Sequence, residues 1–211
     1  MKKSVLTLAA VAAFSLASKA QTFGFNKGDV ILEGSIGFSS SDNKSNETRT
    51  TAVSLSPKAG YFITDKFAVG LDVNYSASKN TDYSGSSDSY TKSNGVGAGV
   101  FGRYYFWNPG QRFKVYGEAD LDYTNTGNES SNGTTTIKSD KVNTFGLNAG
   151  IGANFFLTQK VAIGYKFANV IGYSTSKVDK DGSKPTNNFY LGLNNFNNFF
   201  SAGQFSLTFV L

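Results

Sequence analysis

The chain has 211 residues, enough for one domain, and 20 basic against 15 acidic side chains give a net charge of +5. It contains no cysteine and no histidine, so it can form no disulfide framework and no histidine-based proton shuttle. Its 23 glycines, many aromatics and only three prolines favour long β-strands.

Residues 1–20 have the pattern of a secretory signal peptide, with cleavage expected after Ala20 and a mature domain over 21–211. The apolar run at 5–16 is well short of the ~20 residues of a membrane-spanning helix. Without Lys2, Lys3 and Lys19, 17 basic side chains remain against 15 acidic ones, a net charge of +2. No basic stretch with interleaved aromatics indicates a nucleic-acid partner.

The first three strands are predicted from strict alternation of apolar and polar residues over 29–38, 51–62 and 67–78. Such alternation places the apolar side chains on one face of a sheet and the polar ones on the other. Residues 39–50 are polar without periodicity and predict a solvated loop, whereas 63–66 predict a tight turn. Pro57 cannot donate to a ladder, so we expect a bulge or a locally unpaired position there.

A second polar loop, residues 79–92, leads to the clearest hairpin, whose arms are 93–107 and 112–123. In its first arm one face carries Val96, Ala98, Val100, Gly102, Tyr104 and Phe106. The opposite face carries Gly95, Gly97, Gly99, Phe101, Arg103 and Tyr105. An apolar face with aromatic ends, opposed to a face of charges separated by glycines, is typical of a transmembrane β-barrel strand.

Three more strands are predicted after a third polar loop at 124–141, over 144–156, 161–173 and 199–211. The alternation slips near 169–171, where we expect a bulge. Between the last two strands lies a fourth loop, about 174–198, with an apolar piece at 189–193 that we expect to extend a neighbouring strand.

Together the segments predict an all-β fold, an eight-stranded antiparallel up-and-down transmembrane barrel, because each reaches the ~9–11 residues of a tilted spanning strand. Connections alternate long and short, which places the short turns and both termini on the periplasmic side. Aromatics at the strand ends predict two interfacial girdles. The girdle at the short turns comprises Tyr61, Phe67, Tyr104, Phe106, Phe113 and Phe155, and the one at the long loops comprises Phe38, Tyr75, Tyr123, Phe145 and Tyr173.

Residues 21–211 resemble the small bacterial outer-membrane β-barrel family of OmpA/OmpX type. The resemblance is carried by YFITDKFAVG at 61–70, GVFGRYYF at 99–106 and SAGQFSLTFVL at 201–211. It implies an outer-membrane location and a closing strand that the barrel-assembly machinery recognises. The family usually ends in phenylalanine, whereas this chain ends in Leu211 with Phe209 two residues before it.

Nine charged residues fall on the inward face and are candidates for a paired network in the lumen, because an unpaired buried charge is very costly. They are Glu33, Lys58, Asp72, Arg103, Lys114, Glu118, Asp120, Asp122 and Lys166. An eight-stranded barrel is just wide enough for side chains to fill, so we expect a packed polar lumen. An ion path or a carboxylate site at Glu118, Asp120 and Asp122 is the functional alternative.

We therefore expect a structural outer-membrane barrel that contacts the lipid bilayer and, through its long loops, molecules outside the cell. A small porin-like channel and a soluble lipocalin-like carrier of a hydrophobic ligand remain alternatives. Without histidine an enzyme is not expected, and no cofactor or metal is predicted. Residues 179–183 resemble the start of a calcium loop but lack its distal acid, so a solvated turn is expected there.

Overall fold

The computed structural model of the chain describes residues 23–85, 87–192 and 204–211, and over these residues strands are the only regular elements. They are β1 (Val30–Asn43), β2 (Thr48–Phe62), β3 (Phe67–Asp82), β4 (Ser89–Trp107), β5 (Phe113–Ser131), β6 (Thr136–Lys138), β7 (Val142–Phe156), β8 (Val161–Val178), β9 (Thr186–Leu191) and β10 (Gln204–Val210). The described residues form no helix long and apolar enough to cross a membrane. The predicted signal peptide and residues 199–203 of the predicted last strand lie outside the described residues.

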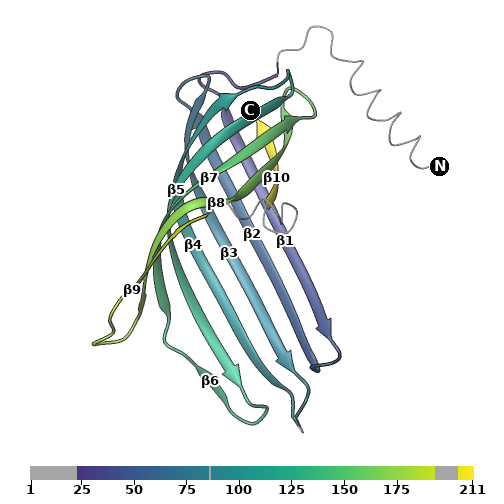
Figure 1. The fold of residues 1–211 in the computed structure, drawn as a ribbon, viewed down its shortest axis with the longest axis vertical. Coiled ribbons are helices and arrows are strands. Elements are labelled where there is room, and N and C mark those ends of the chain that lie inside the picture. Colours follow the sequence, from purple (N-terminus) through teal and green to yellow (C-terminus); the bar gives the residue numbers. More distant parts are fainter. Residues whose placement is uncertain (1–22, 86, 193–203) are drawn as a thin grey trace, which may run out of the picture.

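Eight of the strands form a closed antiparallel barrel, which confirms the predicted fold (Figure 1). β1, β2, β3, β4, β5, β7 and β8 pair in that order, and β10 closes the barrel by pairing with both β1 and β8. At the seam Glu33 opposes Thr208, and Leu207 opposes Ile163. The C-terminus lies at the end of the barrel that carries the short turns (Figure 1).

The strands continue well into the regions that the sequence pattern assigned to loops. The β1–β2 ladder runs to the pair Asn43–Thr48, and the β3–β4 ladder runs to Asp82–Ser89, so most of 39–50 and of 79–92 is strand rather than loop. Most side chains of these extensions are exposed or half-buried polar groups, so no apolar alternation is required there and none exists in the sequence. Backbone hydrogen bonding continues the ladder through these residues.

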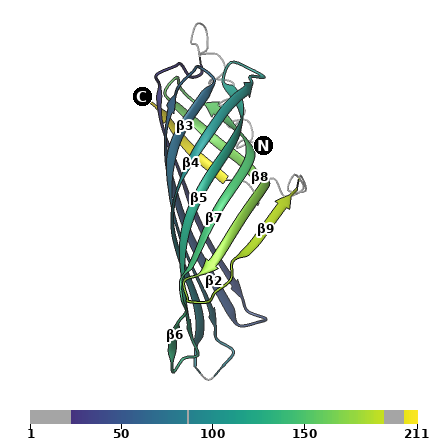
Figure 2. The same cartoon turned by 90° about the vertical axis from the view of Figure 1, so that its left-hand side faces the viewer.

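Two short strands extend the barrel wall at the long-loop end. β6 pairs with β5, and β9 pairs with β8 through residues 186–191. β9 lies outside the closed ring, as Figure 2 shows. The apolar piece predicted at 189–193 therefore does add to a neighbouring strand, over its described residues. The fourth loop is thus partly a hairpin formed by β8 and β9.

The direction of the side chains decides between a membrane barrel and a soluble carrier. Leu71 is 65% exposed, and Val100 and Leu147 are each 47% exposed on the outer wall. Strand residues of the opposite parity, such as Arg103 on β4 and Glu118 on β5, are buried inside. A soluble carrier would bury its apolar row, so the lipocalin-like alternative does not fit this structure.

Both predicted irregularities are present. Pro57 opposes Gly34 of β1, but on its other side the β2–β3 pairing lapses between Leu55 and Lys58. This leaves Pro57 without a partner on β3, the side on which its missing N–H is not needed. In β8 the register with β7 shifts between Lys166 and Ile171, which is the expected bulge.

Gly70 lets two inward-facing layers approach each other closely. A Cβ on Gly70 would meet the carbonyl oxygen of Ala59 and lie 2.7 Å from both the Gly60 Cα and the Phe101 ring. We therefore expect Gly70→Ala to lower the free energy of unfolding by about 1–3 kcal/mol, measured by urea unfolding in lipid vesicles. Gly34→Ala is the matched control, because a Cβ there meets nothing within 4 Å. Equal stability of the two variants would contradict this expectation.

Candidate functional site

Arg103 of β4 lies at the centre of the lumen and is fully buried. Its Nη1 and Nη2 donate to the two carboxylate oxygens of Glu33 on β1, each at 2.9 Å, and its Nε donates to Glu118 Oε2 on β5 at 2.7 Å. The guanidinium carbon lies 4.1 Å from the centre of the Tyr116 ring. A bidentate fork of this kind fixes geometry as well as charge. Arg103 thus connects opposite walls of the barrel.

Glu118 links this centre to two lysines. Its Oε1 accepts from Lys58 Nζ of β2 at 2.8 Å and from Lys166 Nζ of β8 at 2.9 Å. Lys166 also donates to Asp120 at 2.8 Å. Six of the nine predicted lumen charges therefore lie in one connected network contributed by five strands.

The other three predicted charges lie outside these ion pairs. Asp122 accepts a hydrogen bond from Asn148, which also donates to Asp120. Asp72 stands opposite Lys58 in the β2–β3 register, and its Oδ2 is buried without a hydrogen-bond partner. Lys114 lies near the short turns, beside Gly24 of the segment that precedes β1.

A chain of uncharged groups completes the network and was not assigned to it from the sequence. Tyr105 donates to Asn154 Oδ1 at 2.8 Å, Asn154 donates to Thr208 Oγ1 at 3.3 Å, and Thr208 donates to Glu33 at 3.0 Å. Asn154 and Thr208 are fully buried. The alternation in the sequence indicates that both side chains point inward, but their partners depend on how the barrel closes. This chain joins β10 to β1 and β7, and so ties the closing seam to the arginine centre.

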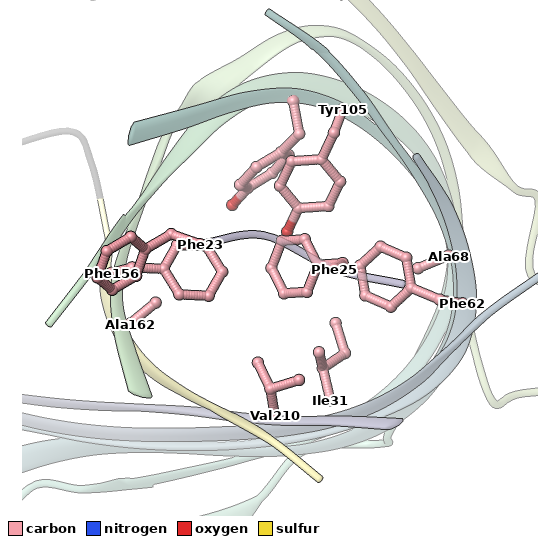
Figure 3. Packing of buried hydrophobic residues seen from close by; sticks show 10 residues of the cluster. Phe23, Phe25, Ile31, Phe62, Ala68, Tyr105, Phe156, Ala162 and Val210 are labelled. Atoms are coloured by element: carbon pink, nitrogen blue, oxygen red, sulfur yellow. The ribbon is translucent and has the colours of Figure 1, made fainter. Parts of the chain in front are cut away.

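Between the charge network and the short turns the lumen is filled by apolar side chains, as Figure 3 shows. Phe25, which precedes β1, stacks on Phe62 at 4.3 Å and lies 4.7 Å from Tyr105 and 5.1 Å from Phe156, measured between ring centroids. Residues 21–28 carry no periodic pattern, so no element is predicted there from the sequence. We call the buried cluster the aromatic plug; it comprises Phe23, Phe25, Ile31, Phe62, Ala68, Tyr105, Tyr116, Phe156, Ala162 and Val210.

The segment carrying Phe23 and Phe25 is held at its backbone and at one ring. Gly28 N–H donates to Phe62 O at 2.8 Å, and Lys27 N–H donates to Asp65 Oδ1 at 2.7 Å. The Arg112 guanidinium carbon lies 4.4 Å from the Phe23 ring centre. The end of the barrel with the short turns is therefore closed by the chain's own N-terminal segment.

The predicted girdle residues lie on the outer wall near the two ends of the apolar band. Ten of the eleven are exposed and Phe67 is half-buried. Among the described residues no group of three or more histidine, cysteine, aspartate or glutamate side chains is placed to hold a metal ion. Inside the barrel, the paired charges connect the strands of the wall to one another.

Comparison with known proteins places the chain. The family model "Outer membrane protein beta-barrel domain" matches residues 6–207. The chain resembles the outer membrane protein OprG from Pseudomonas aeruginosa, with 15% identity over 89% of this chain and 98% of that one and a TM-score of 0.50. It also resembles E. coli outer membrane protein W, with 13% identity, coverages of 89% and 99%, and a TM-score of 0.45.

A third similar structure is a major outer membrane protein from Thermus thermophilus, with 11% identity, coverages of 87% and 99%, and a TM-score of 0.48. At such identities the likeness describes the fold alone. No curated protein matches the sequence. Because the family model covers nearly the whole chain, the protein belongs to the outer membrane protein beta-barrel domain family and is located in the bacterial outer membrane.

Proposed function

We propose that this protein is a structural outer-membrane barrel with a closed lumen, which presents its long hairpins outside the cell. The observation that supports this is Arg103, fully buried and paired across the lumen with Glu33 and Glu118. An ion moving along the barrel would have to break this network. Eight strands leave room only for side chains, and here charged and polar groups fill that room.

The aromatic plug supports the same function. It lies on the side of the network that faces the short turns, and it buries two phenylalanines that precede β1. A permeation path would therefore meet two successive blocks, one ionic and one apolar. We also propose that the charges are structural rather than catalytic, because both oxygens of Glu118 are already occupied by cations.

The second part of the proposal concerns the long hairpins. The β1–β2 and β3–β4 ladders run to the pairs Asn43–Thr48 and Asp82–Ser89, well past the aromatic girdle that contains Tyr75. Hydrogen-bonded hairpins of this length hold polar side chains at set positions away from the membrane. They would offer a contact surface to neighbouring molecules at the cell surface.

Reconstitution into planar lipid bilayers tests the closed lumen. We expect no stepwise conductance from the folded protein under applied voltage, because the paired charges and the aromatic plug occupy the lumen. A porin reconstituted in the same way is the positive control, and a heat-modifiable band on gels shows that the barrel is folded. Reproducible conductance steps would favour the small channel.

A further inference from the structure

The outer wall carries a hollow of about 180 Å³ at the junction of the apolar band and the long hairpins. Its outer lining is two rows of side chains on three adjacent strands, Val53, Ala77 and Asn94 in one row and Thr51, Lys79 and Lys92 in the next. Ala77 is the smallest side chain and stands in the middle of its row. We call this hollow the lysine hollow.

The height of the lysine hollow follows from its position along β3. The girdle residue Tyr75 precedes Ala77 by two residues on the same outward face, so Ala77 lies just beyond the aromatics of the long-loop end. Lys79 and Lys92 lie two residues closer to the long loops than Ala77 and Asn94, a distance of about 7 Å along the strands at the usual rise per residue. Aromatic rings favour the headgroup level of a bilayer, so both lysines stand at the outer headgroups.

Lys79 and Lys92 oppose each other directly, an arrangement that is unfavourable between like charges in a sheet. Both ammonium groups also lie over the Tyr90 ring, at 4.9 Å and 4.5 Å from its centre. The nearest acid, Glu129, is 3.5 Å from Lys92 and accepts a hydrogen bond from the Tyr90 hydroxyl, which lowers the pKa of Glu129. Lys138 of β6 stands opposite Glu129.

This row therefore holds three lysines against one carboxylate, and the charge is not balanced within it. A phosphate group above Lys79 and Lys92 would relieve their repulsion. The Thr51 hydroxyl and the Asn94 amide stand beside it as further donors, and the Ala77 dip leaves space for the attached group. Acyl chains of the same molecule would continue down the apolar wall past Val53.

We propose that the lysine hollow binds the anionic phosphorylated headgroup of an acylated lipid in the outer leaflet. The inference rests on the proposed orientation, with long hairpins outside the cell, and goes beyond it by assigning a ligand to the outer wall. It is independent of whether the lumen conducts. Charge complementarity and height favour a membrane lipid over a soluble anion.

The test uses full-length protein purified from outer membranes and reconstituted in phosphatidylcholine bilayers with bisphosphorylated lipid A. After extraction in mild detergent, native mass spectrometry counts retained lipid A. We expect Lys79→Gln/Lys92→Gln to lower retention about tenfold, since each lysine near a membrane surface contributes to anionic lipid binding. Lys44→Gln/Lys180→Gln removes two loop lysines and should leave retention unchanged.

Two further variants separate charge from shape. Lys79→Arg/Lys92→Arg keeps both charges and should retain lipid A, whereas Ala77→Phe keeps the lysines but fills the dip and should lose it. Heat modifiability on gels reports folding of every variant separately, so failure of the barrel is distinguishable from failure of the site. Protease accessibility of the long hairpins on intact cells tests the orientation by itself.

Equal retention by the wild type and the glutamine variant would overturn the proposal. So would equal retention of lipid A stripped of its phosphates, or undiminished retention by the Ala77→Phe variant. Displacement of lipid A by millimolar inorganic phosphate would show that the hollow takes a soluble anion instead, and would overturn the choice of a membrane lipid.

Discussion

Replacing Arg103 with methionine is expected to lower the free energy of unfolding by about 3–5 kcal/mol. The substitution leaves Glu33 buried without a cation and removes one of the cations that face Glu118. Losing one partner of a buried ion pair costs far more than the pair contributes, because an uncompensated charge remains out of water. Urea unfolding of the barrel in lipid vesicles, followed by tryptophan fluorescence or gel mobility, measures the change.

A double variant makes this prediction specific to charge. Arg103→Met/Glu33→Gln removes the stranded carboxylate, while Glu118 keeps Lys58 and Lys166 as partners. It should therefore recover at least half of the lost stability. A second control, Lys160→Met in a short turn, removes an exposed charge and should change stability little. If Arg103→Met alone unfolds with the wild-type midpoint, the network does not stabilise the barrel.

Phe25→Ala is expected to destabilise the barrel by a similar amount, about 3–5 kcal/mol, because the ring is buried among other aromatics. The loss comprises the contacts with Phe62, Tyr105 and Phe156 and the cavity left between them. Detachment of the segment around Gly28 would add to it. The measurement is again unfolding in vesicles, together with protection of residues 23–28 from proteolysis.

The matched control removes a phenylalanine side chain that is exposed rather than packed in the lumen. Phe189 of β9 is 67% exposed beyond the closed ring, so Phe189→Ala should change stability by less than about 1 kcal/mol. Equal effects of the two substitutions would show that Phe25 stabilises the barrel no more than an exposed side chain does. That result would contradict the prediction that the plug closes the short-turn end.

The wall of the barrel could be predicted within the apolar band but not beyond it. The tight turn at 63–66 and the interruption at Pro57 are visible in the sequence because each has local chemistry, a turn sequence or a missing N–H. The strand extensions toward Asn43 and Asp82 are not visible, since a ladder solvated on both faces needs no side-chain periodicity.

The aromatic plug shows a second limit of the sequence pattern. Phe62, Tyr105 and Phe156 carry apolar side chains on the face that charges occupy elsewhere, so alternation predicts where they point but not what they meet. Phe23 and Phe25 belong to no strand and have no periodic signal at all. Their burial follows only once three turns and the closing strand surround one space.

By itself the sequence determined which side of the wall each strand residue faces, since that parity is a local property of the extended backbone. It thereby indicated the class of membrane barrel and the inward charges. Only the tertiary structure decided which charges pair. Glu33 and Arg103 are 70 positions apart, and Thr208 meets Glu33 across 175 positions. Those contacts depend on register and closure, which bring side chains from every part of the chain to the same height in one narrow lumen.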